Sequence, residues 1–200
     1  MRRLTKIVMV ILTIILSLFQ VVSCTAVNRG GPIYWEEYPD GTVRTNDLTR
    51  LQELQKKVPF PIILPDYLPG GMKSYDIDMV FGYVPGPDGK VPSLSIFFHY
   101  LPSARDIDLS ESRLQDWYPP TSPRYTLAEE NPDYTPIELA GIEVLEYSGF
   151  GTVLRSGQRF PVSSFQYLWE QNDLIFSASV LGYNQSESRK IIESVIKKLS

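Results

Sequence analysis

The sequence contains a single cysteine, Cys24, and a single histidine, His99, among 200 residues. One cysteine cannot form a disulfide within the chain, and a zinc centre normally needs several Cys or His ligands. A Ser-His-Asp triad would depend on His99, which faces the more polar side of its predicted strand, and the sequence has neither a Gly-x-Ser-x-Gly motif nor a Gly-rich phosphate loop. These absences predict a protein without a metal, a cofactor or catalytic activity.

Acidic residues are common, with 23 Asp and Glu against 19 Lys and Arg. Asp76 and Asp78 share one strand face, and Asp106 and Asp108 are expected to lie in a loop, yet neither pair has the spacing of an EF-hand calcium loop. Charges on a solvated surface explain them without a metal. Two carboxylates could also hydrolyse a glycosidic bond, but with so many acidic residues a pair carries weight only if it lines a cleft.

The sequence also lacks the run of about 20 apolar residues that a transmembrane helix needs. A shorter apolar run, Ile7 to Phe19, follows the positive residues Arg2, Arg3 and Lys6 and precedes Val21-Val22-Ser23-Cys24. A positive start, a short apolar core and a small residue before the cleavage point are typical of a secretory signal peptide. The alternative is an uncleaved signal anchor with an incidental cysteine.

The four residues Val21-Val22-Ser23-Cys24 resemble the bacterial lipobox, which has an aliphatic residue, a small or aliphatic residue, a small residue and then Cys. The resemblance implies that a diacylglyceryl group is attached to the Cys24 thiol and that a peptidase cuts between Ser23 and Cys24. It predicts a palmitate-bearing lipoprotein that its lipid holds on the extracytoplasmic side of a membrane of the cell envelope. Two acyl chains give stable anchoring, whereas one holds only marginally.

Charge supports anchoring by lipid alone. Cleavage after Ser23 removes three positive residues and no negative one, so the net charge changes from −4 to −7. An acidic chain is poorly suited to nucleic acid and gains nothing overall from anionic head groups. We therefore expect a membrane partner through Cys24, an unidentified envelope protein or ligand, and no nucleic acid.

The remaining sequence predicts a tether over residues 24–45 and one extracytoplasmic domain over residues 46–200. The tether is rich in Gly and Pro and has no clear periodicity. Asn46 to Lys57 has helical spacing of leucines, with Asn46 as the N-cap. Prolines at every fourth position from Pro61 to Pro69 exclude a helix there, so this apolar segment is expected to cross the core as extended chain.

Alternation of apolar and polar residues predicts two hairpins, built from residues 75–83 with 94–100 and 165–169 with 174–180. A turn is also predicted at Ala140-Gly141. The stretch from Ser103 to Tyr134 reads as irregular, with one short helix near Leu109 to Trp117.

The chain ends in an amphipathic helix that begins at the N-cap Asn184, with Glu187 three residues later as in a capping box. Half-apolar strands need a cover, and this helix provides one. The expected fold is α+β, an antiparallel sheet with helices packed on one face in a single domain.

The chain from Val58 onward resembles a family of extracytoplasmic bacterial domains of unknown function that often follow a membrane anchor. The resemblance rests on residues 59–72, on the hairpin Leu168 to Phe176 and on the closing helix Ser186 to Leu199. The stretch from Ser103 to Tyr134 departs from the family pattern. The resemblance implies a fold and a location and brings no catalytic residues.

Aromatic residues outside the predicted strands are the candidate binding residues. Trp35, Tyr38, Trp117 and Tyr118 accompany prolines, and exposed Trp and Tyr often form binding surfaces. The alternative is that they fold over the sheet as part of the core, because aromatic residues also dominate core burial.

The leading hypothesis is a non-enzymatic, lipid-anchored binding or sensory protein of the cell envelope. A second is a carrier of a lipid or apolar ligand, which predicts a large apolar cavity between sheet and helices. A third is a carboxylate-based envelope hydrolase, which predicts a cleft with a strongly raised carboxyl pKa.

Overall fold

The computed structural model describes residues 32–87, 89–118, 126–155 and 158–200. Pro32 to Ser200 form one compact unit. Cys24 and Ser23, the predicted lipidation and cleavage residues, lie outside the described residues.

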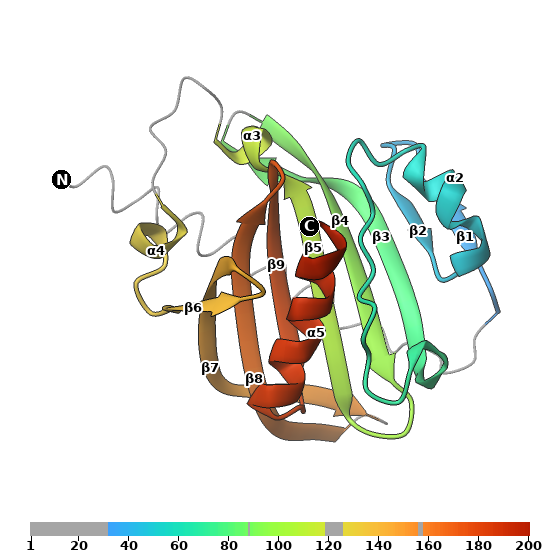
Figure 1. The fold of residues 1–200 in the computed structure, drawn as a ribbon. Helices are drawn as coiled ribbons and strands as arrows, with labels where there is room; N and C mark the ends of the chain where they lie inside the picture. Colours follow the sequence, from blue (N-terminus) through green and yellow to red (C-terminus); the bar gives the residue numbers. More distant parts are fainter. Residues whose placement is uncertain (1–31, 88, 119–125, 156–157) are drawn as a thin grey trace. The chain divides into compact units, whose positions relative to one another are not determined.

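A single antiparallel sheet dominates this unit, and its nine strands lie in the order β1-β2-β3-β4-β5-β9-β8-β7-β6 (Figure 1). The predicted α+β class is confirmed. The strands are β1 (Trp35–Glu37), β2 (Val43–Thr45), β3 (Tyr75–Gly86), β4 (Gly89–Tyr100), β5 (Arg105–Arg113), β6 (Thr135–Leu139), β7 (Ile142–Arg155), β8 (Gln158–Gln171) and β9 (Leu174–Leu181). The helices are α2 (Leu51–Gln55), α3 (Leu114–Trp117), α4 (Leu127–Glu130) and α5 (Gln185–Lys198), with short 3-10 turns at Leu48–Arg50 and Met72–Ser74.

The core lies on the sheet face that α5 covers (Figure 1). Ile191, Ile192, Val195 and Ile196 of α5 are at most 1% exposed. Beneath them, Trp169 of β8 is fully buried, and its ring is stacked on Phe176 of β9 with ring centroids 4.8 Å apart. The apolar residues that alternate along the strands and those that form a stripe along α5 therefore pack against each other in one core.

The start of α5 and the β8–β9 turn both have the structure that the sequence predicts. Asn184 accepts the Glu187 N–H at 2.9 Å, and both halves of the predicted capping box are present. At the β8–β9 turn, Asn172 and Asp173 have φ angles of 52° and 61°. A two-residue turn with both residues left-handed fits the right-handed twist of a hairpin.

Residues 35–37 and 43–45 are strands of the sheet, which corrects the predicted tether over residues 24–45. β2 pairs with β3, Val43 and Thr45 are fully buried, and the Tyr34 N–H donates to Asn46 Oδ1 at 2.9 Å. Strands of three residues are too short to show a period, which explains the wrong boundary.

Two further predictions need correction. The helix expected over residues 46–57 is a 3-10 turn followed by the five-residue α2, and its cap is Asp47 rather than Asn46. The stretch from Ser103 to Tyr134, expected to be irregular, contains β5 at the middle of the sheet. Glu111 occupies an inward position of β5, so the apolar alternation of this strand breaks off early.

Candidate functional site

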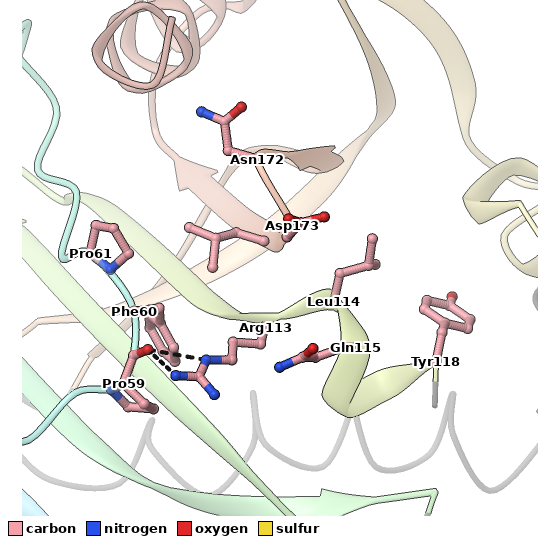
Figure 2. Close-up of a pocket in the computed structure, with 10 residues that line it drawn as sticks. Pro59, Phe60, Pro61, Arg113, Leu114, Gln115, Tyr118, Asn172 and Asp173 are labelled. Carbon is pink, nitrogen blue, oxygen red and sulfur yellow. Dashed lines mark hydrogen bonds between the residues drawn. The ribbon is translucent and has the colours of Figure 1, made fainter. Parts of the chain in front are cut away.

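A crevice of about 480 Å³ opens at one end of the sheet, where three segments meet (Figure 2). The first is the proline-rich segment Pro59–Pro61, the second is the end of β5 with α3, and the third is the β8–β9 turn. Its lining residues are Pro59, Phe60, Pro61, Arg113, Leu114, Gln115, Tyr118, Asn172, Asp173 and Leu174.

Polar contacts hold these segments together. The Arg113 guanidinium donates from Nε to the Pro59 carbonyl oxygen at 3.1 Å, and its Nη2 donates to the same oxygen (Figure 2). The Leu114 N–H donates to the Asp173 carbonyl at 2.8 Å. Asn172 Nδ2 donates to the Leu199 carbonyl at 2.5 Å, which ties the turn to the end of α5. The guanidinium of Arg113 and the amide of Asn172 thus bind backbone carbonyls of the segments around the crevice.

The crevice combines apolar and polar lining. Pro59, Phe60 and Pro61 contribute apolar surface, whereas the exposed Gln115 and Asp173 offer hydrogen-bonding groups. The Tyr118 hydroxyl donates to Glu130 Oε2 at 2.6 Å. Sites for small ligands combine apolar surface with a few placed polar groups, and the crevice offers both kinds of lining in comparable amounts.

Two carboxyl groups have strongly raised pKa values, and both lie on β5 outside the crevice. Burial raises the pKa of Glu111 to about 8, while the hydrogen bond that its Oε1 accepts from the Ile63 N–H at 3.3 Å lowers it in part. Burial also raises the pKa of Asp108 to about 7, against the lowering effect of His99.

These two carboxyl groups cannot form an acid–base pair across one bond. Three positions separate Asp108 and Glu111 on the same strand, so their side chains point to opposite faces of the sheet. Glu111 is 1% exposed on the face of α5, and Asp108 lies on the other face, in register with Phe97 and Ser179. Neither lines the crevice.

His99 lies on the sheet face opposite α5, as predicted, and Phe98 beside it in the sequence is fully buried. Its Nδ1 is 2.8 Å from Asp106 Oδ1. The strand register also brings Asp76 beside His99. Asp78 is 3.5 Å from the Arg44 guanidinium and accepts the Tyr34 hydroxyl. Within the described residues, no group of three or more metal-ligating side chains is placed to hold an ion.

The four candidate aromatic residues do not form one surface. Tyr118 lines the crevice, and Trp117 precedes it in α3. Trp35 and Tyr38 lie in and just after β1, the edge strand four positions from β5 in the sheet. The Trp35 ring packs under the Arg50 guanidinium at 4.0 Å and against the core, and the Tyr38 hydroxyl donates to Glu36 at 2.7 Å. Core packing is therefore the better description of Trp35.

The sequence did not indicate three residues of the crevice, Arg113, Asn172 and Asp173, as site residues. The proline-rich segment 59–72 and the hairpin 168–176 were both singled out from the sequence, and the crevice lies where they meet. Comparisons with protein families, with curated proteins and with solved structures found no match to this chain. No helix within the described ranges is long and apolar enough to cross a membrane.

Proposed function

We propose that this chain is a non-enzymatic, lipid-anchored binding or sensory protein of the bacterial cell envelope. A lipid on Cys24 holds it on the extracytoplasmic side of a membrane, and the crevice at the end of the sheet takes its ligand. The binding role rests on the hydrogen bonds that Arg113 and Asn172 form in the crevice. These side chains hold its shape by binding backbone carbonyls, which suits recognition better than proton transfer.

The two alternatives have less support. An apolar carrier needs a cavity between the sheet and α5, yet large side chains fill that layer: Tyr167, Trp169, Ile192 and Ile196 are each at most 1% exposed. A hydrolase needs a strongly raised carboxyl pKa in a cleft, and the two carboxyl groups with strongly raised pKa values, Asp108 and Glu111, lie outside the crevice on opposite sheet faces.

Replacing Cys24 by Ala is expected to abolish lipidation, because in proteins with a lipobox the cysteine sulfur is the atom that carries the diacylglyceryl group. The measurement is incorporation of labelled palmitate into the protein in growing bacteria, followed by separation of membrane and soluble fractions. Ser23→Ala, which keeps both a small residue before the cleavage point and the thiol, is the matched control and should still be labelled. Palmitate in the Cys24→Ala protein would disprove anchoring at this residue.

Filling the crevice tests the binding role. We expect Gln115→Trp to lower the recovery of envelope components by the lipidated protein about tenfold, equivalent to about 1.4 kcal/mol of binding free energy. Gln115 is exposed on α3 and lines the crevice, so a large ring there occupies ligand space without disturbing the core. The readout is chemical crosslinking and affinity capture from native envelopes. Gln52→Trp, at an exposed position of α2, is the control, and equal recovery by both variants would exclude the crevice as the binding site.

A further inference from the structure

The β7–β8 hairpin continues beyond the rest of the sheet. β9 ends at Leu181, opposite Ser164 of β8, and Ser164 pairs in turn with Gly149 of β7. Past that point β7 and β8 pair only with each other, as far as Arg155 and Gln158. Figure 1 shows the two strands running on together along the lower edge of the view.

The two faces of this extension differ. Val153 on one face is 2% exposed, and a Cβ on Gly151 would lie 2.8 Å from Leu181 Cδ2, so this face is turned toward the sheet. The opposite face is exposed along its whole length. Its residues, which we call the hairpin face, are Phe150, Thr152, Leu154, Arg159 and Pro161.

The hairpin face leaves large apolar side chains in water. Phe150 is 93% exposed and Leu154 is 45% exposed. Of the nine exposed large apolar or aromatic side chains among the described residues, Phe150 and Leu154 lie on the hairpin face, and Tyr147 and Phe160 lie on the opposite face of the same two strands. Exposed apolar groups gathered on one protrusion indicate a surface that binds a partner.

The charge of the hairpin is opposite to that of the domain. No Asp or Glu occurs from Tyr147 to Trp169, the longest such stretch after Cys24, whereas Arg155 and Arg159 fall within it. A basic, apolar protrusion on an acidic protein is attracted locally to an anionic surface even though the whole chain is not. Phe and Leu flanked by Arg are the side chains that enter the boundary between head groups and acyl chains.

The chain before the sheet is short. Tyr34 is fixed by its hydrogen bond to Asn46 and follows Cys24 by ten residues. Ten extended residues span at most about 35 Å. A domain held by a lipid on Cys24 therefore stays beside the bilayer, where even a weak second contact is favoured by its high effective concentration.

We propose that the hairpin face inserts into the head-group region of an anionic bilayer and forms a second membrane contact, which sets the orientation of the domain and of its crevice. This inference rests on the proposed lipid anchor at Cys24. A protein partner fits less well, because a stable protein interface buries about 800 Å² on each side, more than five outward side chains of a two-stranded ribbon provide.

The test uses the mature lipidated protein in vesicles of phosphatidylcholine with phosphatidylglycerol. Thr152→Cys places an environment-sensitive nitrobenzoxadiazole label on the hairpin face, and Gln52→Cys places it on the exposed side of α2 as the control. The label at position 152 is expected to shift to shorter wavelength and to be quenched several-fold more than at position 52 by a spin label near the head groups. Adding Phe150→Ser and Arg159→Glu, or replacing the vesicles by pure phosphatidylcholine, should remove most of this difference.

Equal access of aqueous dithionite to both labels on a lipidated protein would overturn the proposal and leave the anchor intact. Protection of position 152 only in native envelopes, with full access on vesicles, would overturn it in favour of a protein partner. The intact mass of the purified protein reports lipidation of Cys24 separately, so failure of the anchor and failure of the hairpin contact are distinguishable.

Discussion

Replacing Ile196 by Ala is expected to lower the free energy of unfolding by about 2–5 kcal/mol, the range for large-to-small substitutions at fully buried sites. Ile196 is 0% exposed in α5, and its carbonyl accepts Gln171 Nε2 at 3.2 Å, so the helix is held against β8 at this level. Trp169 and Phe176 belong to the same buried cluster as Ile196, and their stacked rings make this cluster slow to rearrange around missing atoms. The measurement is urea unfolding of the compact unit from Pro32 to Ser200.

Lys190→Ala is the control for Ile196→Ala, because Lys190 is exposed on the same helix and its loss should change stability by less than about 0.5 kcal/mol. A urea midpoint that Ile196→Ala leaves unchanged, together with weaker vesicle binding, would show that α5 serves the membrane instead of the core.

Replacing Glu111 by Gln is expected to stabilise the protein at pH 8 by about 2–4 kcal/mol and to have little effect near pH 4.5. Burial holds the pKa of Glu111 at about 8 in the folded state, above its value in the unfolded chain. Between about pH 4.5 and pH 8 the folded state binds one more proton than the unfolded state, so the free energy of unfolding of the wild-type protein falls as the pH rises through this interval. Gln keeps an oxygen for the Ile63 N–H and carries no charge at any pH.

The measurement for Glu111→Gln is urea unfolding at a series of pH values, with Glu138→Gln at an exposed position of β6 as the control. The expected gain in stability is smaller than the full effect of the pKa shift. The new Gln amide nitrogen would replace an oxygen that has no hydrogen-bond partner among the described residues, and a buried donor without a partner costs free energy. A parallel pH dependence of the wild-type and Glu111→Gln proteins would show that the carboxyl group is already charged in the folded state.

Sequence patterns located the parts of the fold whose periodicity is strong and local. The β8–β9 hairpin and α5 each combine an unbroken apolar pattern with a turn or cap that fits it, Asn172-Asp173 and Asn184 respectively. β1 and β2 are three residues long, and their place in the sheet depends on pairing with β3, which leaves no local pattern. β5 was missed because a glutamate stands at one of its inward positions.

The candidate site was harder to predict than the fold. Tyr118 was selected as an exposed aromatic residue, but the crevice depends on Arg113 lying opposite Leu174, a pairing between strands far apart in the sequence. The proline-rich segment that completes the crevice has no regular secondary structure, so its path is decided by tertiary contacts such as Arg113 with Pro59. Neither contact has a periodic signal in the sequence.

The strand order has a consequence for how the chain folds. β1 to β5 are paired in sequence order, as are β6 to β9, and only the pairing of β5 with β9 joins distant parts of the chain. Apart from the 29-residue connection between β2 and β3, neighbouring strands within each half close short loops. The junction must close the longer loop between Arg113 and Leu174, and we expect it to be the slow step. Until β9 arrives, the first half exposes the free edge of β5, and an open edge of this kind pairs readily with other chains. The period between synthesis of β5 and docking of β9 is therefore when aggregation threatens this protein most.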